Sequence, residues 1–362
     1  LRPGGWEWPA ALLWSLALLL GVEMLLRWGG FRYAHIPVSM RYVSTLARIG
    51  TEQTLHKRRF HIDYALDRTL LWKPVPNLGI TNSEGFLGPE WRGGKGPLRR
   101  LIALGDSCTV AGEDPYPALL GRSLSGWEVW NAGVGSWSSF QGLQLLRTRL
   151  SSYRPDAVTV YFGWNDHWLA WAAPDKELSS LLDRQWRLLK LVERSRLLQA
   201  LLKAANVLRA GGKPGPPDFA PYRVSEEDYE ANLRGIVGAV RAAGGRPLLL
   251  TAPSALTPGH PTTISLCRTT RNFDDPARIA AVHAAYNERV RRASLQTGAV
   301  LVDLERHFAA RPASEGFFTD GIHLTAKGHA AAAELIKRAL LSQPDPSAPF
   351  GSTARGLQGG KY

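Results

Sequence analysis

Sulfur is scarce in this chain, whose 362 residues include two cysteines, Cys108 and Cys267. Two cysteines cannot build a disulfide framework, and their spacing matches no metal site, so cysteine usage does not indicate a compartment. Internal repeats are absent, and so is any motif that reads a nucleic-acid groove. These absences exclude a disulfide-stapled scaffold and a repeat protein, and they predict no nucleic-acid partner.

Acidic residues are also in deficit, with 31 Asp and Glu against 44 Lys and Arg, which gives a formal net charge of +13. This excess is typical of an arginine-rich proteome, and attraction to anionic lipid or polysaccharide surfaces is the alternative. The basic residues are scattered, which further disfavours nucleic acid. Hydrophobic residues make up 44% of the chain, which is enough for a sizeable core.

One long apolar run, residues 10–26, lies near the start of the chain. Its length is close to the roughly 20 residues that a bilayer span needs, and its one charge, Glu23, is near the end where it can reach the interface. Tryptophans flank the run, as they do at membrane interfaces. A signal peptide is the alternative, but no A-x-A-like site follows, and a buried core helix is disfavoured because the run has no polar face. We predict an uncleaved membrane anchor over residues 1–30.

From Arg99 onward, short apolar runs alternate with helical patterns. The runs are continuous, as expected of strands that helices cover on both faces. The five runs cover residues 101–105, 127–133, 157–163, 247–252 and 299–304. The helical patterns between them include residues 140–150, 226–243 and 276–297. This alternation predicts an α/β domain with a parallel, doubly wound sheet over residues 99–342.

Other segments depart from this alternation. Residues 31–98 contain short strand and turn patterns, and residues 93–97 are typical of a linker. Residues 169–217 interrupt the domain after its third strand with a Leu- and Arg-rich helical stretch and a loop. A lid or substrate-binding element and a solvated helical hairpin both fit that composition. The tail, residues 343–362, is rich in Pro, Gly and Ser and is predicted to be disordered.

The tripeptide Gly105-Asp106-Ser107 directly follows the first predicted strand. A serine there lies at the carboxyl edge of a parallel sheet, where ligands bind in open α/β folds. Its hydroxyl needs a base within hydrogen-bond reach, and that base must be held in one tautomer. Asp320 precedes His323 closely enough to orient it from one short loop. The competing base, His329, falls in the helix that Thr325 would cap, so we interpret it as structural.

Acyl transfer from serine also needs donors for the negative oxygen of the tetrahedral intermediate. Two patterns, each directly after a strand, offer such donors. Gly133, in Asn131-Ala-Gly133, can present a backbone N–H group, and Asn165, in Gly163-Trp-Asn-Asp166, can present a side-chain amide. Each pattern alone is equally typical of a turn, because Gly and Asn are favoured there.

Taken in chain order, these patterns resemble the SGNH/GDSL hydrolase family over residues 99–341. The resemblance implies a three-layer α/β/α sandwich with a five-stranded parallel sheet, close to the flavodoxin arrangement. It implies that Ser107 is the nucleophile, His323 its base and Asp320 the orienting acid. The backbone N–H groups of Ser107 and Gly133 and the side chain of Asn165 would form the oxyanion hole. No metal or organic cofactor is implied. The G-x-S-x-G elbow of α/β-hydrolases is absent around Ser107.

The resemblance implies a serine hydrolase that acts on carboxylic esters through an acyl-enzyme. A small-molecule or glycan ester is the expected substrate, with de-O-acetylation of a carbohydrate or cell-surface polymer as the preferred reaction. One alternative is an O-acyltransferase with the same Ser-His-Asp residues, and another is a binding module on a retired hydrolase fold. Trp137, Trp164 and Trp168 could line a sugar or acyl site, although core packing is the more common role. The oligomeric state stays open.

The side of the membrane is ambiguous from charge alone. Basic residues follow the apolar run and only Arg2 precedes it, so the positive-inside rule by itself places the domain in the cytoplasm. The chain begins at Leu1 rather than Met, so this count omits any upstream residues. The anchor and the region before Arg99 resemble those of membrane-attached bacterial family members that act on cell-surface polymers. We therefore expect a periplasmic or extracellular catalytic domain.

Overall fold

The computed structural model describes residues 7–33, 52–55, 58–61, 64–77, 80–91, 96–110, 112, 114–170, 173–208, 221–256, 276–312 and 315–342. The predicted disordered tail (343–362), the loop at 211–217, most of the linker at 93–97 and Cys267 lie outside the described residues.

Within the described residues, the centre of the molecule is a five-stranded parallel sheet with the strand order β6-β5-β7-β8-β9. Its strands are β5 (Arg99–Gly105), β6 (Trp127–Gly133), β7 (Ala157–Tyr161), β8 (Arg246–Leu250) and β9 (Val300–Val302). This confirms the predicted parallel sheet. Because the chain moves from β5 outward to β6 and then back across to β7, the strand order reverses at β5. Ligands bind at the carboxyl ends of the strands at such a point.

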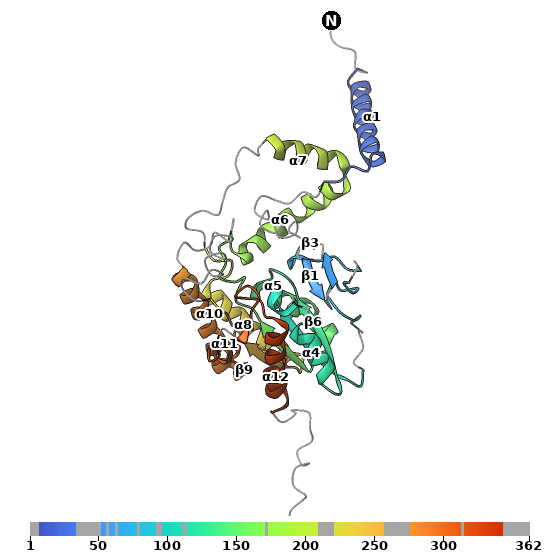
Figure 1. Ribbon diagram of the computed structural model, residues 1–362. Helices are drawn as coiled ribbons and strands as arrows, with labels where there is room; N and C mark the ends of the chain where they lie inside the picture. Colours follow the sequence, from blue (N-terminus) through green and yellow to red (C-terminus); the bar gives the residue numbers. More distant parts are fainter. Residues whose placement is uncertain are drawn as a thin grey trace, which may run out of the picture.

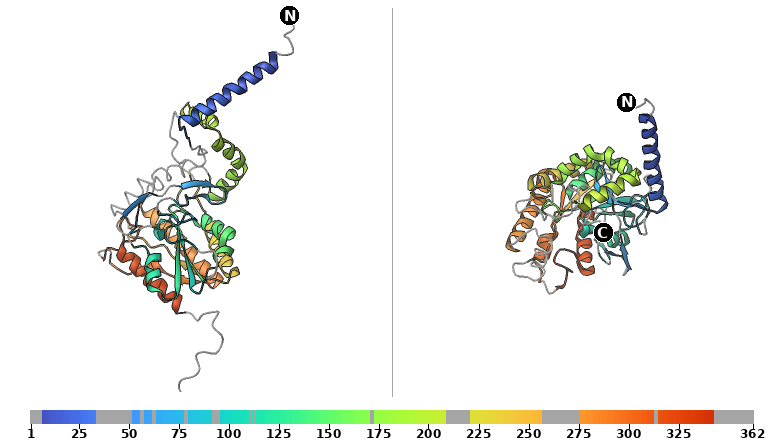
Figure 2. Two further views of the ribbon diagram at one scale, coloured as in Figure 1. Left: turned by 90° about the vertical axis from the view of Figure 1, so that its right-hand side faces the viewer. Right: turned by 90° about the horizontal axis from the view of Figure 1, so that it is seen from above.

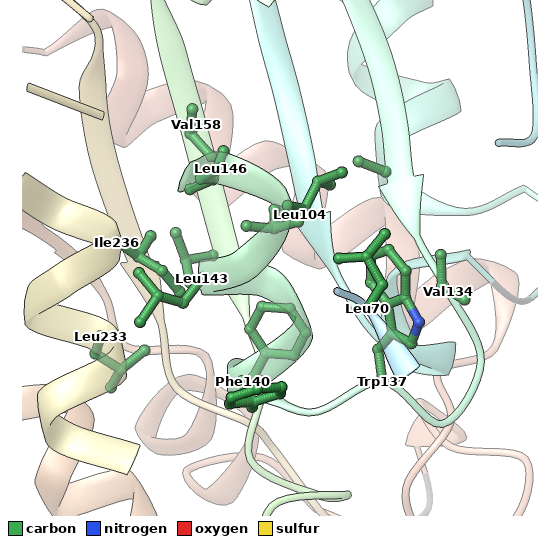
Figure 3. Close-up of a cluster of buried hydrophobic side chains, with 14 of the residues drawn as sticks. Leu70, Leu104, Val134, Trp137, Phe140, Leu143, Leu146, Val158, Leu233 and Ile236 are labelled. Carbon is green, nitrogen blue, oxygen red and sulfur yellow. The ribbon is translucent and has the colours of Figure 1, made fainter. Parts of the chain in front are cut away.

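Helices cover both faces of the sheet. Successive residues of each strand point to opposite faces, so each strand contributes apolar side chains to both faces. In β5, Ile102 and Leu104 belong to one hydrophobic cluster, and Leu101 and Ala103 belong to the other. The first cluster packs against α5 (Ser139–Tyr153), α8 (Glu226–Ala242) and α10 (Pro276–Thr297). Figure 3 shows part of it, with Leu143 and Leu146 of α5 between the sheet and Leu233 and Ile236 of α8. The second packs against α4 (Tyr116–Ser123), α11 (Leu304–Ala309) and α12 (Ala326–Leu341). The predicted three-layer sandwich is confirmed.

The segment before the sheet forms two small antiparallel pairs. They are β1 (Glu52–Leu55) with β2 (Arg58–His61), and β3 (Tyr64–Asp67) with β4 (Leu71–Pro74). Beyond β4, the Trp91 ring stacks on both Phe86 and Trp130, with ring centroids 4.3 and 4.9 Å away respectively. Trp130 belongs to β6, so this segment shares the core of the main sheet.

Three further helices lie at one end of the molecule: α1 (Glu7–Trp28), α6 (Asp175–Arg194) and α7 (Arg196–Leu208). Helix α1 projects away from the globular part in every view, and α6 and α7 connect its foot to that part (Figures 1 and 2). Residues Trp8–Trp28 are long and apolar enough to cross a membrane, and a signal sequence has the same properties. The helical prediction for residues 169–210 is confirmed for α6 and α7.

Candidate active site

Ser107 lies at the carboxyl end of β5, on the first residue of the short helix α3 (Ser107–Val110). The turn that presents it depends on the two glycines that flank it in space. A Cβ atom at Gly105 would lie 2.6 Å from the Tyr161 carbonyl oxygen, and one at Gly133 would lie 2.8 Å from the Val110 nitrogen. No larger residue fits at either position without a backbone shift. The glycines therefore bring the ends of β6 and β7 against the Ser107 turn.

His323 and Asp320 reach Ser107 from the loop that precedes α12. The Nε2 atom of His323 lies 3.0 Å from Ser107 Oγ, and its Nδ1 atom lies 2.7 Å from Asp320 Oδ2. Asp320 Oδ1 accepts the backbone N–H groups of Ile322 and His323 at 3.1 and 2.8 Å. A carboxylate can only accept, so Nδ1 carries the proton and Nε2 presents its lone pair to the Ser107 hydroxyl.

The charges around His323 favour its protonated form. Burial opposes a positive charge on His323, but its hydrogen bond to Asp320 and the charges of Asp320 and Asp106 outweigh burial and raise its pKa above the ordinary value of 6.5. Burial likewise opposes the charge on Asp320, yet the hydrogen bonds and charge of His323 hold the pKa of Asp320 at about 2. The pair therefore consists of an ionised carboxylate and an imidazole that is more basic than a free one.

Asp106 and Asn165 form a buried contact on the other side of Ser107. The Asn165 side-chain nitrogen donates to Asp106 Oδ2 at 3.1 Å and to the Trp137 carbonyl oxygen at 3.0 Å. Asp106 Oδ1 accepts the Cys108 N–H at 2.8 Å, and burial raises the pKa of Asp106 to about 6. Both amide hydrogens of Asn165 are therefore engaged. Sequence reasoning gave Asp106 no role, although its place before Ser107 was the available signal.

Gly133 is placed beside the Ser107 turn, but its N–H group also has an acceptor. It donates to the side-chain oxygen of Asn131 at 2.9 Å. By contrast, the Ser107 N–H group has no acceptor among the described residues. The three predicted oxyanion donors are thus gathered around one turn, and two of them are occupied in this structure.

Two buried acids form hydrogen bonds and an ion pair that hold the loops with Asn165 and Trp137 in place. Asp166 accepts the N–H groups of Ser139 (2.9 Å) and Gly163 (3.1 Å), and burial raises its pKa to about 7. Asp175, in α6, forms a buried ion pair with Arg223 at 2.8 Å. Arg223 also donates to the Ser136 carbonyl oxygen at 2.9 Å. The start of the insertion is therefore linked to the loop whose Trp137 carbonyl holds Asn165.

The alternative candidates have other roles in the structure. His329 is buried in α12 and accepts the Tyr116 N–H at 3.3 Å, and Thr325 caps that helix as predicted. Burial raises the pKa of the Cys108 thiol well above its ordinary value, so Cys108 stays a packed thiol. Two of the three tryptophans, Trp137 and Trp164, are fully buried, which confirms core packing for them and disfavours the alternative role of lining a ligand site.

Trp168 is the one of the three that is not fully buried. Among the described residues, no group of three or more His, Cys, Asp or Glu side chains could hold a metal ion.

Comparison with known proteins gives one family and a set of distant structural neighbours. The sequence model of the GDSL-like lipase/acylhydrolase family matches residues 103–331. A search of curated proteins finds no match. A lipase/acylhydrolase from Enterococcus faecalis is similar, at 16% identity with a TM-score of 0.43, over 67% of this chain and 95% of that one. An acetyl xylan esterase is similar at 17% identity with a TM-score of 0.43, over 67% of this chain and 100% of that one. A GDSL-like lipase from Bacteroides thetaiotaomicron is similar at 15% identity with a TM-score of 0.38, over 67% of this chain and 87% of that one.

Proposed function

Because this chain belongs to the GDSL-like lipase/acylhydrolase family, and so is an esterase-type hydrolase, we propose that it cleaves carboxylic esters with Ser107 as nucleophile, His323 as base and Asp320 as orienting acid. The observation that carries this proposal is the pair of hydrogen bonds from Ser107 Oγ to His323 Nε2 and from His323 Nδ1 to Asp320, at 3.0 and 2.7 Å. Proton transfer between a nucleophile and its base needs this reach and this tautomer.

The reaction follows from this arrangement. Ser107 Oγ attacks the ester carbonyl carbon as its proton passes to His323 Nε2, and Asp320 stabilises the imidazolium that forms. The tetrahedral intermediate then breaks its bond to the alcohol, which leaves with the proton from His323. Water, deprotonated by His323, attacks the acyl-Ser107 ester and releases the carboxylic acid, which restores the free serine.

The negative oxygen of each intermediate needs donors, and we assign the Ser107 N–H group as the first of them. The Gly133 N–H and the Asn165 amide are the second and third. Both must exchange or share their present acceptors, Asn131 and the Asp106–Trp137 pair, when the oxygen becomes negative. Donors directed at developing charge are worth a few kcal/mol each.

We further propose that the substrate is an O-acylated carbohydrate or cell-surface polymer, reached from a periplasmic or extracellular domain that α1 anchors. The apolar length of α1 supports the anchor, because a span of 21 residues is long enough to cross a bilayer. A domain fixed at a membrane meets esters of the cell surface more often than soluble ones.

The test compares the full chain in detergent with its Ser107→Ala variant on p-nitrophenyl acetate, butyrate and octanoate. We expect Ser107→Ala to lower kcat by at least about 10⁴-fold, because no other group can form the acyl-enzyme. An exposed serine of α5 provides the matched control, and Ser152→Ala should keep full activity. Melting curves would show that both variants fold.

Turnover retained by Ser107→Ala would overturn the nucleophile assignment. The preference among the three chain lengths measures the size of the acyl pocket. Acetate release from an O-acetylated polysaccharide then tests the substrate class, and a failure to release acetate by an enzyme active on p-nitrophenyl acetate would remove that part of the proposal alone.

A further inference from the structure

Helix α7 has its apolar side turned outward. Leu201 and Leu208 lie two turns apart on one face of this helix and are 57% and 87% exposed. Val207 is also exposed. A surface helix of a globular protein buries its apolar face and exposes its polar one. On α7, by contrast, these three apolar side chains are exposed.

Two polar residues of α7, Gln199 and Lys203, contact other parts of the protein. Gln199 is buried, and its side-chain oxygen accepts the Tyr33 N–H at 3.0 Å. Its side-chain nitrogen donates to the Glu193 carbonyl oxygen of α6 at 2.9 Å. The Lys203 ammonium lies over the Phe31 ring, 5.4 Å from its centroid. These contacts set the rotation of α7, and with it the outward direction of Leu201 and Leu208.

The last turns of α6, which precede α7 in the chain, also carry exposed leucines. Leu188 and Leu191 of α6 are 63% and 56% exposed. Between residues 184 and 208 the sequence has six Lys or Arg and one acidic residue, Glu193. Exposed apolar side chains in a helical segment with this excess of basic residues are typical of helices that lie in the headgroup region of an anionic membrane.

Glu23 joins this surface to α1. One carboxylate oxygen accepts the Arg196 N–H at 3.0 Å, and the other accepts the Leu197 N–H at 2.8 Å. The Ser195 hydroxyl donates to the same carboxylate at 3.1 Å. A negative charge at the first turn of a helix is stabilised by the free N–H groups there. Glu23 thus holds the start of α7 at the foot of α1, and α7 runs crosswise from that foot (Figure 1).

We propose that α7 and the exposed leucines of α6 lie on the surface of an anionic lipid bilayer, in its interfacial plane, with Glu23 joining them to α1. This inference rests on the proposed membrane anchor and extends it. A second attachment beside the anchor prevents the hydrolase domain from swinging freely. The Ser107 site is then held at a constant height and acts on esters close to the membrane surface.

Nitroxide scanning of the full chain in liposomes tests the inference. The liposomes contain equal parts of phosphatidylethanolamine and phosphatidylglycerol. The labels are placed in a Cys267→Ser background, and Cys108 is kept because it is buried. Labels at Leu201→Cys and Leu208→Cys should collide with oxygen far more often than with a water-soluble nickel chelate. Lys203→Cys, on the opposite face of the same helix, is the matched control and should favour the nickel chelate. Leu16→Cys, midway along α1, reports on the anchor.

Each outcome decides one point. Lipid-type accessibility at positions 16, 201 and 208, with water-type accessibility at 203, supports the inference. Lipid-type accessibility at position 16 with water-type accessibility at 201 and 208 overturns the inference but not the anchor. Water-type accessibility at position 16 overturns the anchor itself. Protection of positions 201 and 208 from both reagents would mean that a protein covers this face, which also overturns the inference.

The role of Glu23 is tested with the same label at position 201. Glu23→Ala should lower its oxygen-to-nickel ratio, because the start of α7 loses its acceptor. Glu193→Ala, which removes an exposed carboxylate of α6 bonded to Lys190, should leave the ratio unchanged. An equal ratio in Glu23→Ala and the unaltered chain would show that Glu23 does not hold α7 at the bilayer.

Discussion

The two sides of Ser107 are built differently. On the base side, His323 and Asp320 are three residues apart on one loop, and their side chains are 29% and 53% exposed. On the oxyanion side, Asn165 and Gly133 are buried, and their N–H groups already donate to Asp106, the Trp137 carbonyl oxygen and Asn131. The base side is hydrogen-bonded in the direction of proton transfer before substrate arrives, whereas the proposed oxyanion donors Asn165 and Gly133 would have to change partners.

This difference predicts which substitutions change kcat the most. A donor that is free and fixed stabilises charge without reorganisation, and a donor that must first leave an acceptor stabilises it by less. We therefore expect substitutions on the base side to have the larger effects on kcat. Substitutions on the oxyanion side should show whether a residue contacts the oxyanion, which changes kcat, or only makes internal contacts in the resting protein, which changes stability.

Among substitutions of the residues around Ser107, the largest expected effect is that of Asp320→Asn. The Asn oxygen can still accept the backbone N–H groups of Ile322 and His323, so the loop should keep its shape. Its amide nitrogen would face His323 Nδ1 and force the proton onto Nε2, the wrong tautomer for accepting the Ser107 proton. We expect kcat to fall by roughly 10³–10⁴-fold. Steady-state kinetics with p-nitrophenyl acetate would measure it, and a loss below tenfold would mean that Asp320 does not set the tautomer.

The pH profile tests the same side of Ser107 in the unaltered enzyme. The base works as neutral imidazole, so activity is present above the His323 pKa and is lost as pH falls through it. Asp320 and Asp106 raise that pKa, which places the midpoint of the acid limb of kcat/KM above 6.5. In Asp320→Asn the midpoint of the residual activity should move to lower pH. A flat profile between about pH 5 and 8 would contradict a histidine base.

Asn165→Ala should have the next largest effect. Loss of one oxyanion donor lowers kcat by about 10²–10³-fold with little change in KM. The same change leaves Asp106 and the Trp137 carbonyl oxygen without their shared donor, so stability should also fall, by about 1–3 kcal/mol. Kinetics below the melting transition, with denaturation measured in parallel, would separate the two effects. A change confined to stability would make Asn165 a structural residue.

The sequence predicted the parts of the site that depend on local spacing. The parallel sheet follows from five apolar runs, and Asp320 could be paired with His323 because only two residues of one loop separate them. Two contacts could not be predicted in this way. Asn165 meets Asp106 across 59 residues, and Glu23 meets Arg196 across 173. Such contacts depend on how strand ends and helices pack. The motifs therefore predicted which groups could be oxyanion donors, but they could not show that Asn165 and Gly133 already have acceptors.

The smallest expected effect is also the most specific test of that occupancy. Asn131→Ala removes the acceptor of the Gly133 N–H and leaves this donor free to face the substrate. A hydrogen bond of ordinary net strength then no longer competes with the oxyanion, so kcat/KM should rise by roughly 2- to 10-fold. Asn131→Asp is the matched control, because it keeps the acceptor, and its kcat/KM should not rise. A fall in Asn131→Ala with an unchanged melting temperature would mean that Asn131 positions the Gly133 N–H group rather than occupying it.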